Sequence, residues 1–318
     1  MSSQPPGIAD PVAPGARLGR LEIGARAATG GMSEVFRAVD TETGKTVALK
    51  LLKLPSDPTE AAFARHRFDQ EAEAVARLDH PAVVRLHSAG TTPDGTPYLA
   101  LEWVDGRDLG ALFREEQPPP WRVLRLVRSV ALAVVHAHDN GVVHRDLKAS
   151  NILVCGEDDV RLIDFGLALL DGSTDPPGVR ALGSAHSMAP EQVSGGGDRR
   201  SDVYSLGVIL YRGLVGRYPF HSRQAVQILA AHLLHDVPRF ERYRPDLRLP
   251  DGLEDTVRRC LAKNPDDRFG SVEDLVRAID AYLVRLELPA VRERGSLAWL
   301  PWVGAAAVAG LVLAWWLA

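Results

Sequence analysis

The stretch that decides the fold is His144-Arg145-Asp146-Leu147-Lys148-Ala149-Ser150-Asn151, with Asp164-Phe165-Gly166 following after an Ile/Leu/Val-rich run. A single Asp or Asn is most often a turn former, so the spacing carries the signal here. The stretch places an acid, a cation and an amide in one short loop, and a second acid follows a predicted strand. Such groups suit the positioning of phosphates and of a hard cation, which need charge compensation more than covalent chemistry.

Three further sequence motifs precede this stretch, and a fourth follows it. A turn with two adjacent glycines, at 27–35, lies between two predicted strands. Val47-Ala48-Leu49-Lys50 falls on a third predicted strand, and Glu71 falls in a predicted helix. Ala189-Pro190-Glu191 follows the second acid. The order of the pieces is as informative as their content.

Taken in this order, the pieces resemble the signature of protein kinases, in the form found in bacterial eukaryotic-like (Hanks-type) serine/threonine kinases. Gly30-Gly31-Met32 and Met188-Ala189-Pro190-Glu191 are similar to that group in particular. The resemblance covers residues 18–286. It implies an α+β, two-lobed protein kinase fold, with a small antiparallel-sheet N-lobe carrying one helix (18–104) and a larger helical C-lobe (105–286).

The residue patterns agree with this division. Strand-like runs lie at 21–27, 34–39, 46–52, 83–89 and 98–101, and apolar residues at helical spacing lie at 59–78, 121–140, 201–214, 223–235, 253–262 and 272–286. The first part of the chain is therefore predicted to form a five-stranded antiparallel sheet with one helix. Residues 1–17 carry four prolines and read as a flexible tail.

The resemblance implies a role for each matched residue. Asp146 is the expected catalytic base, and Lys148 is expected to steady the γ-phosphate. Lys50 is expected to hold the α- and β-phosphates, with Glu71 orienting it through an ion pair. Glu73 is a rival for that pairing, but positions two apart face different sides of a helix. Glu71 is preferred because it lies three residues after Phe68, on the apolar stripe.

ATP and Mg²⁺ are the substrate and the cofactor that the resemblance implies. Asn151 and Asp164 are the expected Mg²⁺ ligands, because Mg²⁺ takes hard oxygen ligands. The expected ATP-binding residues are Ala28, Gly30, Gly31, Met32, Val35, Ala48, Lys50, Glu102, Val104, Asp108 and Leu153. Ala28 and Ser33 stand where the family usually has glycine, which puts the flexibility of the loop and its nucleotide affinity in question.

The predicted function is a serine/threonine protein kinase that phosphorylates protein substrates, including itself. All five catalytic positions are filled, by Lys50, Glu71, Asp146, Asn151 and Asp164. Two alternatives stay open: a nucleotide-binding pseudokinase scaffold, supported by the altered glycine loop, and a small-molecule phosphotransferase, opposed by residues 189–191. Ser173 and Thr174 are the expected regulatory phosphosites, facing Arg145.

Composition narrows the remaining classes. The net charge is −4, with no broad basic excess, so nucleic-acid binding through a generally basic surface is disfavoured. The chain has only 2 cysteines, which form no disulfide framework and no zinc motif.

Residues 297–318 carry no charged side chain and are predicted to form a C-terminal transmembrane helix about 33 Å long after a juxtamembrane linker at 287–296. Tryptophans lie near both ends of the run, and Arg285, Arg292 and Arg294 precede it. The positive-inside rule then predicts a single-pass protein of the cytoplasmic membrane, with the kinase domain facing the cytoplasm. No apolar run follows Met1, so no signal peptide is expected. Small residues at 304–310 predict pairing of two chains, a homodimer suited to trans-autophosphorylation.

Overall fold

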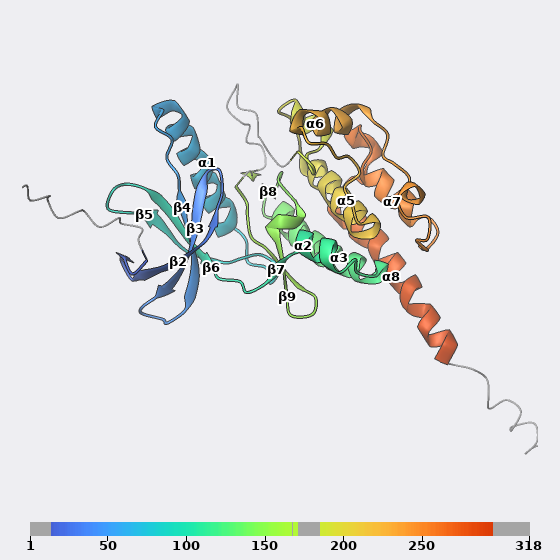
Figure 1. Ribbon diagram of the computed structural model, residues 1–318, viewed down its shortest axis with the longest axis horizontal. Helices are drawn as coiled ribbons and strands as arrows, with labels where there is room; N and C mark the ends of the chain where they lie inside the picture. The colour runs from blue at the N-terminus through green and yellow to red at the C-terminus, as the bar shows by residue number, and fades with distance from the viewer. Residues whose placement is uncertain (1–13, 167, 171–184, 295–318) are drawn as a thin grey trace, which may run out of the picture.

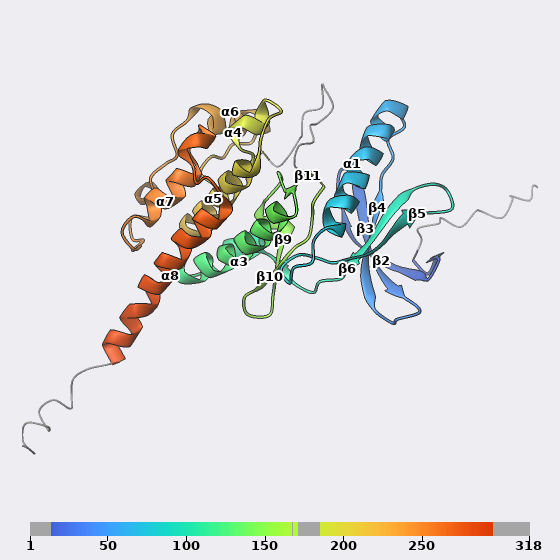
Figure 2. The same cartoon turned by 180° about the vertical axis from the view of Figure 1, so that it is seen from behind.

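The computed structural model describes residues 14–166, 168–170 and 185–294. It has two lobes, one built around a sheet and one built from helices, which lie side by side (Figures 1 and 2). This arrangement is the one that the sequence predicts. Among the described residues, no helix combines the length and the apolar character needed to span a bilayer, and the apolar run at 297–318 lies outside them.

The N-lobe is a six-stranded antiparallel sheet in the order β1-β2-β3-β4-β6-β5. Its strands are β1 (Arg17–Leu18), β2 (Leu21–Thr29), β3 (Ser33–Asp40), β4 (Thr46–Leu52), β5 (Leu86–Thr91) and β6 (Pro97–Glu102). The five predicted strands are present, and the short β1 adds a sixth. β5 begins later than predicted, because Val83 and Val84 pair with Leu162 of the other lobe instead of joining the sheet.

The two faces of this sheet have different tasks. Phe36, Val47 and Leu49 alternate onto one face and are buried there in a small apolar cluster. Val35 pairs directly with Lys50, so these two side chains share the opposite face. Helix α1 (Pro58–Ala76) contacts β4, β5 and β6, and it begins at Asp57, whose carboxylate accepts the Thr59 and Glu60 N–H groups at 2.9 Å.

The C-lobe is built from helices around one large apolar core. Its elements are α2 (Leu109–Glu115), α3 (Pro120–Asp139), η1 (Ala149–Asn151), α4 (Pro190–Val193), α5 (Arg199–Val215), α6 (Ala225–Leu234), η2 (Phe240–Arg242), α7 (Leu253–Cys260), η3 (Pro265–Asp267) and α8 (Val272–Arg294). Helix α5 is buried nearly all round and packs against α3, α7 and α8. A helix buried on every side is a central support, and α5 fills that place here.

Two small sheets lie between the N-lobe sheet and the helices of the C-lobe (Figures 1 and 2). One joins β7 (Arg107–Asp108), β9 (Ile152–Cys155) and β10 (Asp159–Leu162), and the other joins β8 (Val142–Val143) and β11 (Leu169–Leu170). The strands of these sheets flank the loop at 144–151 and the segment at 164–166. The strand expected before Asp164 is present as β10.

Helix α8 corrects one expectation. The helical pattern predicts an end near residue 286, but the helix continues to Arg294, so most of the segment at 287–296 is helical. Most of the added residues are good helix formers; the exception is Pro289, which removes one backbone donor and crowds the carbonyl of the preceding turn.

Candidate functional site

Lys50 lies at the centre of a compact charge cluster. Its Nζ contacts Glu71 Oε1 at 2.5 Å and Oε2 at 2.8 Å, and Asp164 Oδ1 at 3.0 Å. Strand β4 supplies the lysine and helix α1 supplies Glu71, whereas Asp164 comes from the segment after β10. The cluster therefore ties the two lobes together at the position where the phosphates are expected.

The structure distinguishes the two glutamates that compete for Lys50. Glu71 is buried against the sheet, with a side chain only 4% exposed. Glu73 points to solvent and pairs with Arg77 one helical turn on, at 2.6 Å. The predicted pairing of Lys50 with Glu71 is therefore present, and it follows from the apolar stripe that Phe68 marks.

The charged groups of this cluster shift one another's pKa values. Burial would lower the pKa of Lys50, but the two carboxylates raise it above its ordinary value, so the lysine is a cation at neutral pH. Burial would raise the pKa of Asp164, but the Lys50 ammonium lowers it to about 2. Burial, reinforced by Asp164, raises the pKa of Glu71 against the pull of Lys50.

The loop at 144–151, here named the catalytic loop, carries the second group of predicted site residues. Lys148 Nζ contacts Asp146 Oδ2 at 2.7 Å, so the expected base and the expected γ-phosphate cation lie together. Asn151 Nδ2 donates to the Asp146 carbonyl oxygen at 3.2 Å. These bonds fix the loop internally before any substrate binds.

Asp202, in the first turn of α5, binds the backbone of this loop through its carboxylate. Its carboxylate accepts the N–H groups of His144 at 2.9 Å and Arg145 at 2.8 Å, and it contacts His138 Nε2 at 2.8 Å. Burial opposes its charge, but His138 and the loop lower the pKa of Asp202 below the ordinary range. Arg145 adopts a left-handed φ of 64°, a strained conformation for a residue with a side chain, which these bonds help to stabilise.

One cavity, of about 350 Å³, brings most of the predicted catalytic residues together. It is lined by Lys50, Glu71, Asp146, Lys148 and Asp164, with Gly30, Gly31, Met32 and Ser33 as its cover. The other predicted ATP-binding residues, Ala28, Val35, Ala48, Glu102, Val104, Asp108 and Leu153, do not line it, and neither does Asn151. The cavity therefore corresponds to the phosphate end of the expected site.

The turn between β2 and β3 covers this cavity through backbone groups. Gly30 N–H donates to the Ser33 carbonyl at 2.8 Å, and neither Gly30 nor Gly31 has a positive φ. Lys53, just after β4, was not predicted as a site residue. Its N–H donates to the Met32 carbonyl at 2.8 Å, and its Nζ donates to the Gly30 carbonyl at 3.1 Å. A lysine after a strand is usually solvated, so the pattern gave no signal for this contact.

Arg67 was also missed. It is buried in α1 and lines the same cavity one turn before Glu71. The i, i+4 spacing was the signal that could have found it.

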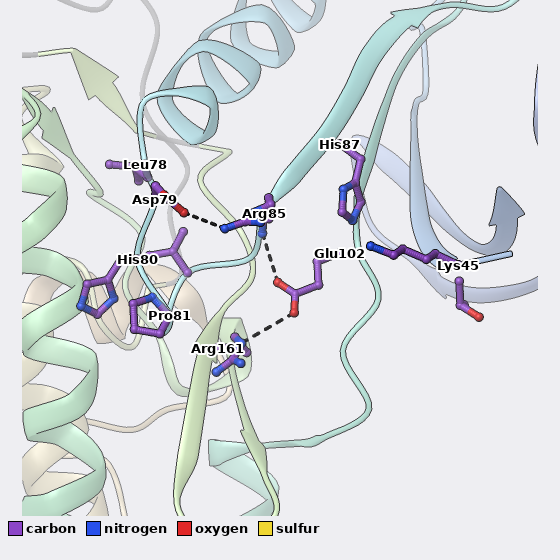
Figure 3. Close-up of a pocket in the computed structure, with 11 residues that line it drawn as sticks. Lys45, Leu78, Asp79, His80, Pro81, Arg85, His87, Glu102 and Arg161 are labelled. Carbon is purple, nitrogen blue, oxygen red and sulfur yellow. Dashed lines mark hydrogen bonds and ion pairs between the residues drawn. The ribbon is translucent and has the colours of Figure 1, made fainter. Parts of the chain in front are cut away.

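The segment after β6 corresponds to the predicted adenine contacts. Glu102 N–H donates to the Arg85 carbonyl at 2.8 Å, so of its two backbone groups only the carbonyl is left for adenine. The Glu102 side chain does not line the cavity that contains Lys50. It lines a second cavity, of about 710 Å³, together with Arg85 and Arg161 (Figure 3). There it accepts the Arg85 N–H at 3.3 Å and lies 3.9 Å from Arg161.

Asp108 and Leu153 lie opposite each other on β7 and β9. Asp108 Oδ1 caps helix α2 by accepting a hydrogen bond from the Ala111 N–H at 2.8 Å. The other carboxylate oxygen is therefore the one available for the expected contact with ribose. Val35, Ala48 and Leu153 are each partly exposed, as apolar pocket walls require. Ser173 and Thr174 lie outside the described residues.

Comparison with known proteins agrees with this geometry. The chain matches the protein kinase domain over residues 22–278. The chain belongs to the protein kinase family. It is 39% identical over 285 residues to serine/threonine-protein kinase pkn3 of Myxococcus xanthus, a match that covers 85% of this chain and 51% of pkn3. The kinase therefore falls in the bacterial Hanks-type serine/threonine group that the sequence predicts.

Two further relatives support this placement. PrkC of Bacillus subtilis is 34% identical over 260 residues, covering 81% of this chain and 39% of PrkC. PknL of Mycobacterium tuberculosis is 37% identical over 291 residues, covering 90% of this chain and 71% of PknL. All three relatives are named as serine/threonine-protein kinases. The matched part of this chain spans about half the length of pkn3 and less than half of PrkC.

Proposed function

We propose that this chain is an active serine/threonine protein kinase that transfers the γ-phosphoryl group of ATP to serine and threonine hydroxyls of proteins, itself included. The observation that carries the proposal is the shared cavity, in which Lys50 is paired with Glu71 and Asp164 while Asp146 and Lys148 lie on the same walls. A pseudokinase scaffold would not need every one of these positions filled and paired.

Each of these residues has a task in the transfer. Asp146 aligns the substrate hydroxyl and accepts its proton as the new oxygen–phosphorus bond forms and the bond from the γ-phosphorus to ADP breaks. Lys148, held beside Asp146, compensates the charge on the transferring group. Lys50 compensates the α- and β-phosphates, and Glu71 prevents it from swinging away.

Asn151 and Asp164 fit a divalent cation, for which we propose Mg²⁺. Because the Asn151 amide nitrogen is bound to the Asp146 carbonyl, its amide oxygen is the atom available to a cation. Asp164 Oδ1 accepts hydrogen bonds from Lys50 Nζ at 3.0 Å and from the Gly166 N–H at 3.2 Å. These bonds orient the carboxylate and leave its other oxygen for the cation. When bound, Mg²⁺ would compensate the phosphate charge. One amide and one carboxylate oxygen are the sparse protein set that Mg²⁺ uses with phosphates.

The experiment is incubation of the chain with labelled ATP, Mg²⁺ and casein, followed by phosphoamino-acid analysis. Label on serine or threonine of either protein supports the proposal, provided that Lys50→Met abolishes it. ATP binding without any label would favour the scaffold. Label recovered only on added small hydroxyl compounds would favour the small-molecule phosphotransferase.

We further propose that residues 297–318 anchor the kinase in the cytoplasmic membrane, with the kinase domain on the cytoplasmic side and two chains paired through the small residues at 304–310. The support is the uncharged run, the arginines before it, and helix α8, which ends at Arg294 just before the run begins. The full chain should pellet with membranes and resist carbonate extraction. Recovery of the full chain in the soluble fraction without detergent would overturn the anchor.

A further inference from the structure

The cavity that Glu102 lines is separate from the one that contains Lys50. It has a volume of about 710 Å³ against about 350 Å³, and the two cavities share no lining residue. Its walls come from the start of β4, from the segment between α1 and β5, and from β10 (Figure 3). The proposed phosphotransfer therefore leaves this larger cavity without a task.

Three cations from separate elements line this cavity. Lys45 lies just before β4, Arg85 lies just before β5, and Arg161 lies on β10. Asp79 neutralises one of them, because it pairs with Arg85 at 2.8 Å on the surface. Lys45 forms no ion pair with any residue that the structure describes. Lys45 and Arg161 are therefore the two cations that remain for a ligand.

Arg161 is a partly buried cation with few partners. Its side chain is 29% exposed, and its one hydrogen bond within the described part of the chain goes to the Val160 carbonyl, at 3.0 Å. Its partner carboxylate, Glu102, lies 3.9 Å away, which is too far for a hydrogen bond. Since a guanidinium carries five N–H groups, Arg161 keeps donors for an anion.

Glu102 lies between the two remaining cations. Figure 3 shows the Lys45 side chain directed toward Glu102, with Arg161 on the other side of its carboxylate. The carboxylate is held weakly, by the Arg85 N–H at 3.3 Å and by the 3.9 Å pair with Arg161. The chain thus already places an anionic group where the cations converge. An anion with more oxygens would satisfy these donors better than this carboxylate does.

One wall of the cavity is apolar. It is formed by Leu78 and Val83, which are buried, and by Pro81, which is exposed. Sites for small organic molecules combine such apolar walls with a few polar groups, and their volumes run from about 300 to 1,000 Å³. The size and lining of this cavity therefore fit an anion that carries a carbon skeleton.

We propose that this cavity binds a small organic phosphate ester. Its phosphate takes the place of the Glu102 carboxylate between Lys45 and Arg161, and its carbon part lies on the apolar wall. The guanidinium fork of Arg161 donates paired hydrogen bonds to the phosphate, and Lys45 adds a point charge. Binding involves no phosphoryl transfer, so the inference goes beyond the proposed kinase activity.

The test is titration calorimetry with phenyl phosphate as the probe. The kinase is saturated with ADP, which occupies the phosphate end of the expected nucleotide site. Phenyl phosphate should then bind with a dissociation constant of about 1 mM or below. Inorganic phosphate should bind about fivefold more weakly, because it leaves the apolar wall uncovered. Equal affinities for the two probes would overturn the assignment of an organic ester.

Three substitutions probe the cavity itself. Arg161→Gln should weaken the binding of phenyl phosphate by about tenfold or more, and Lys45→Gln, at an exposed position, by about fivefold. Glu102→Gln should tighten it by about fivefold, because the neutral amide no longer repels the phosphate. A tighter complex is a result that mere damage to the fold would not give.

Arg77→Gln is the matched control. Arg77 lies two residues before Asp79 but does not line the cavity, and it pairs with Glu73 on the surface of α1. This variant should bind phenyl phosphate within about twofold of the wild-type affinity. Absence of binding to the wild-type kinase up to about 10 mM phenyl phosphate would overturn the site. Wild-type affinity in both Arg161→Gln and Lys45→Gln would overturn it too, as would weaker binding by Glu102→Gln.

Discussion

The catalytic loop at 144–151 and the nucleotide loop at 28–35 cover the same cavity but are held very differently. The catalytic loop is largely buried, and Asp202, Gln192 and Asn151 bind its backbone at 2.8–3.2 Å. The nucleotide loop is exposed at Gly30, Gly31 and Met32, and its tip is held by one internal bond and by Lys53.

The two loops differ in rigidity, and this difference matches the different task that each has in the proposed phosphotransfer. In the proposed phosphotransfer, the groups that move a proton and a phosphoryl must keep their geometry within fractions of an ångström, which the buried position of the catalytic loop in the C-lobe would provide. In the same proposal, the cover over the phosphates must open for nucleotide to enter and leave, so light restraints suit it. Substitutions should therefore have large effects in the first region and small effects in the second.

The largest effect is expected from Asp202→Ala. The substitution leaves two backbone N–H groups and His138 without their buried acceptor, which should lower the free energy of unfolding by about 3–5 kcal/mol. Phosphotransfer should also fall sharply, because the catalytic loop loses its support. Asp198→Ala is the control, since Asp198 caps the same helix at the surface and should cost about 1 kcal/mol. Urea unfolding of both variants measures this, and equal losses would contradict the buried support.

A smaller effect, confined to activity, is expected from Glu71→Gln. The neutral amide cannot hold Lys50 in its place, so kcat/KM for ATP should fall by roughly a hundredfold. Glu73→Gln removes only an exposed pair with Arg77 and should leave the rate within about twofold. Steady-state kinetics with a peptide substrate compares the two. Similar rates for both variants would mean that the ion pair with Lys50 does not orient it.

The sequence predicted much of this division and missed the rest for identifiable reasons. The resemblance of the ordered motifs to protein kinases located Lys50, Asp146 and Asp164, and the helical spacing from Phe68 then chose Glu71 over Glu73. Helices as short as α2 show too few turns for a period, so the helix that Asp108 caps was not predicted. Contacts such as Lys53 with the Gly30 carbonyl join a side chain to a backbone group, which no residue pattern records.

The smallest effect is expected from Lys53→Met. It removes the side-chain contact with the Gly30 carbonyl and a 3.8 Å ion pair with Glu34, but keeps the backbone bond to Met32. An exposed contact of this kind is worth about 1 kcal/mol or less, so KM for ATP should change by about two- to fivefold with kcat nearly constant. Lys45→Met, at the opposite end of β4, is the control and should change neither. A large fall in kcat for Lys53→Met would show that the nucleotide loop is held as rigidly as the catalytic loop.

The most direct test of the account is the Asp146→Asn variant, measured for nucleotide binding and for phosphotransfer on the same preparation. Asn keeps the size of Asp146 but cannot accept the proton, and it leaves Lys50, Glu71 and Asp164 in place. The account predicts a dissociation constant for ATP within a few-fold of the wild-type value and a rate of transfer lower by about a hundredfold or more. A folded Asp146→Asn kinase with a near-normal rate of transfer would contradict it.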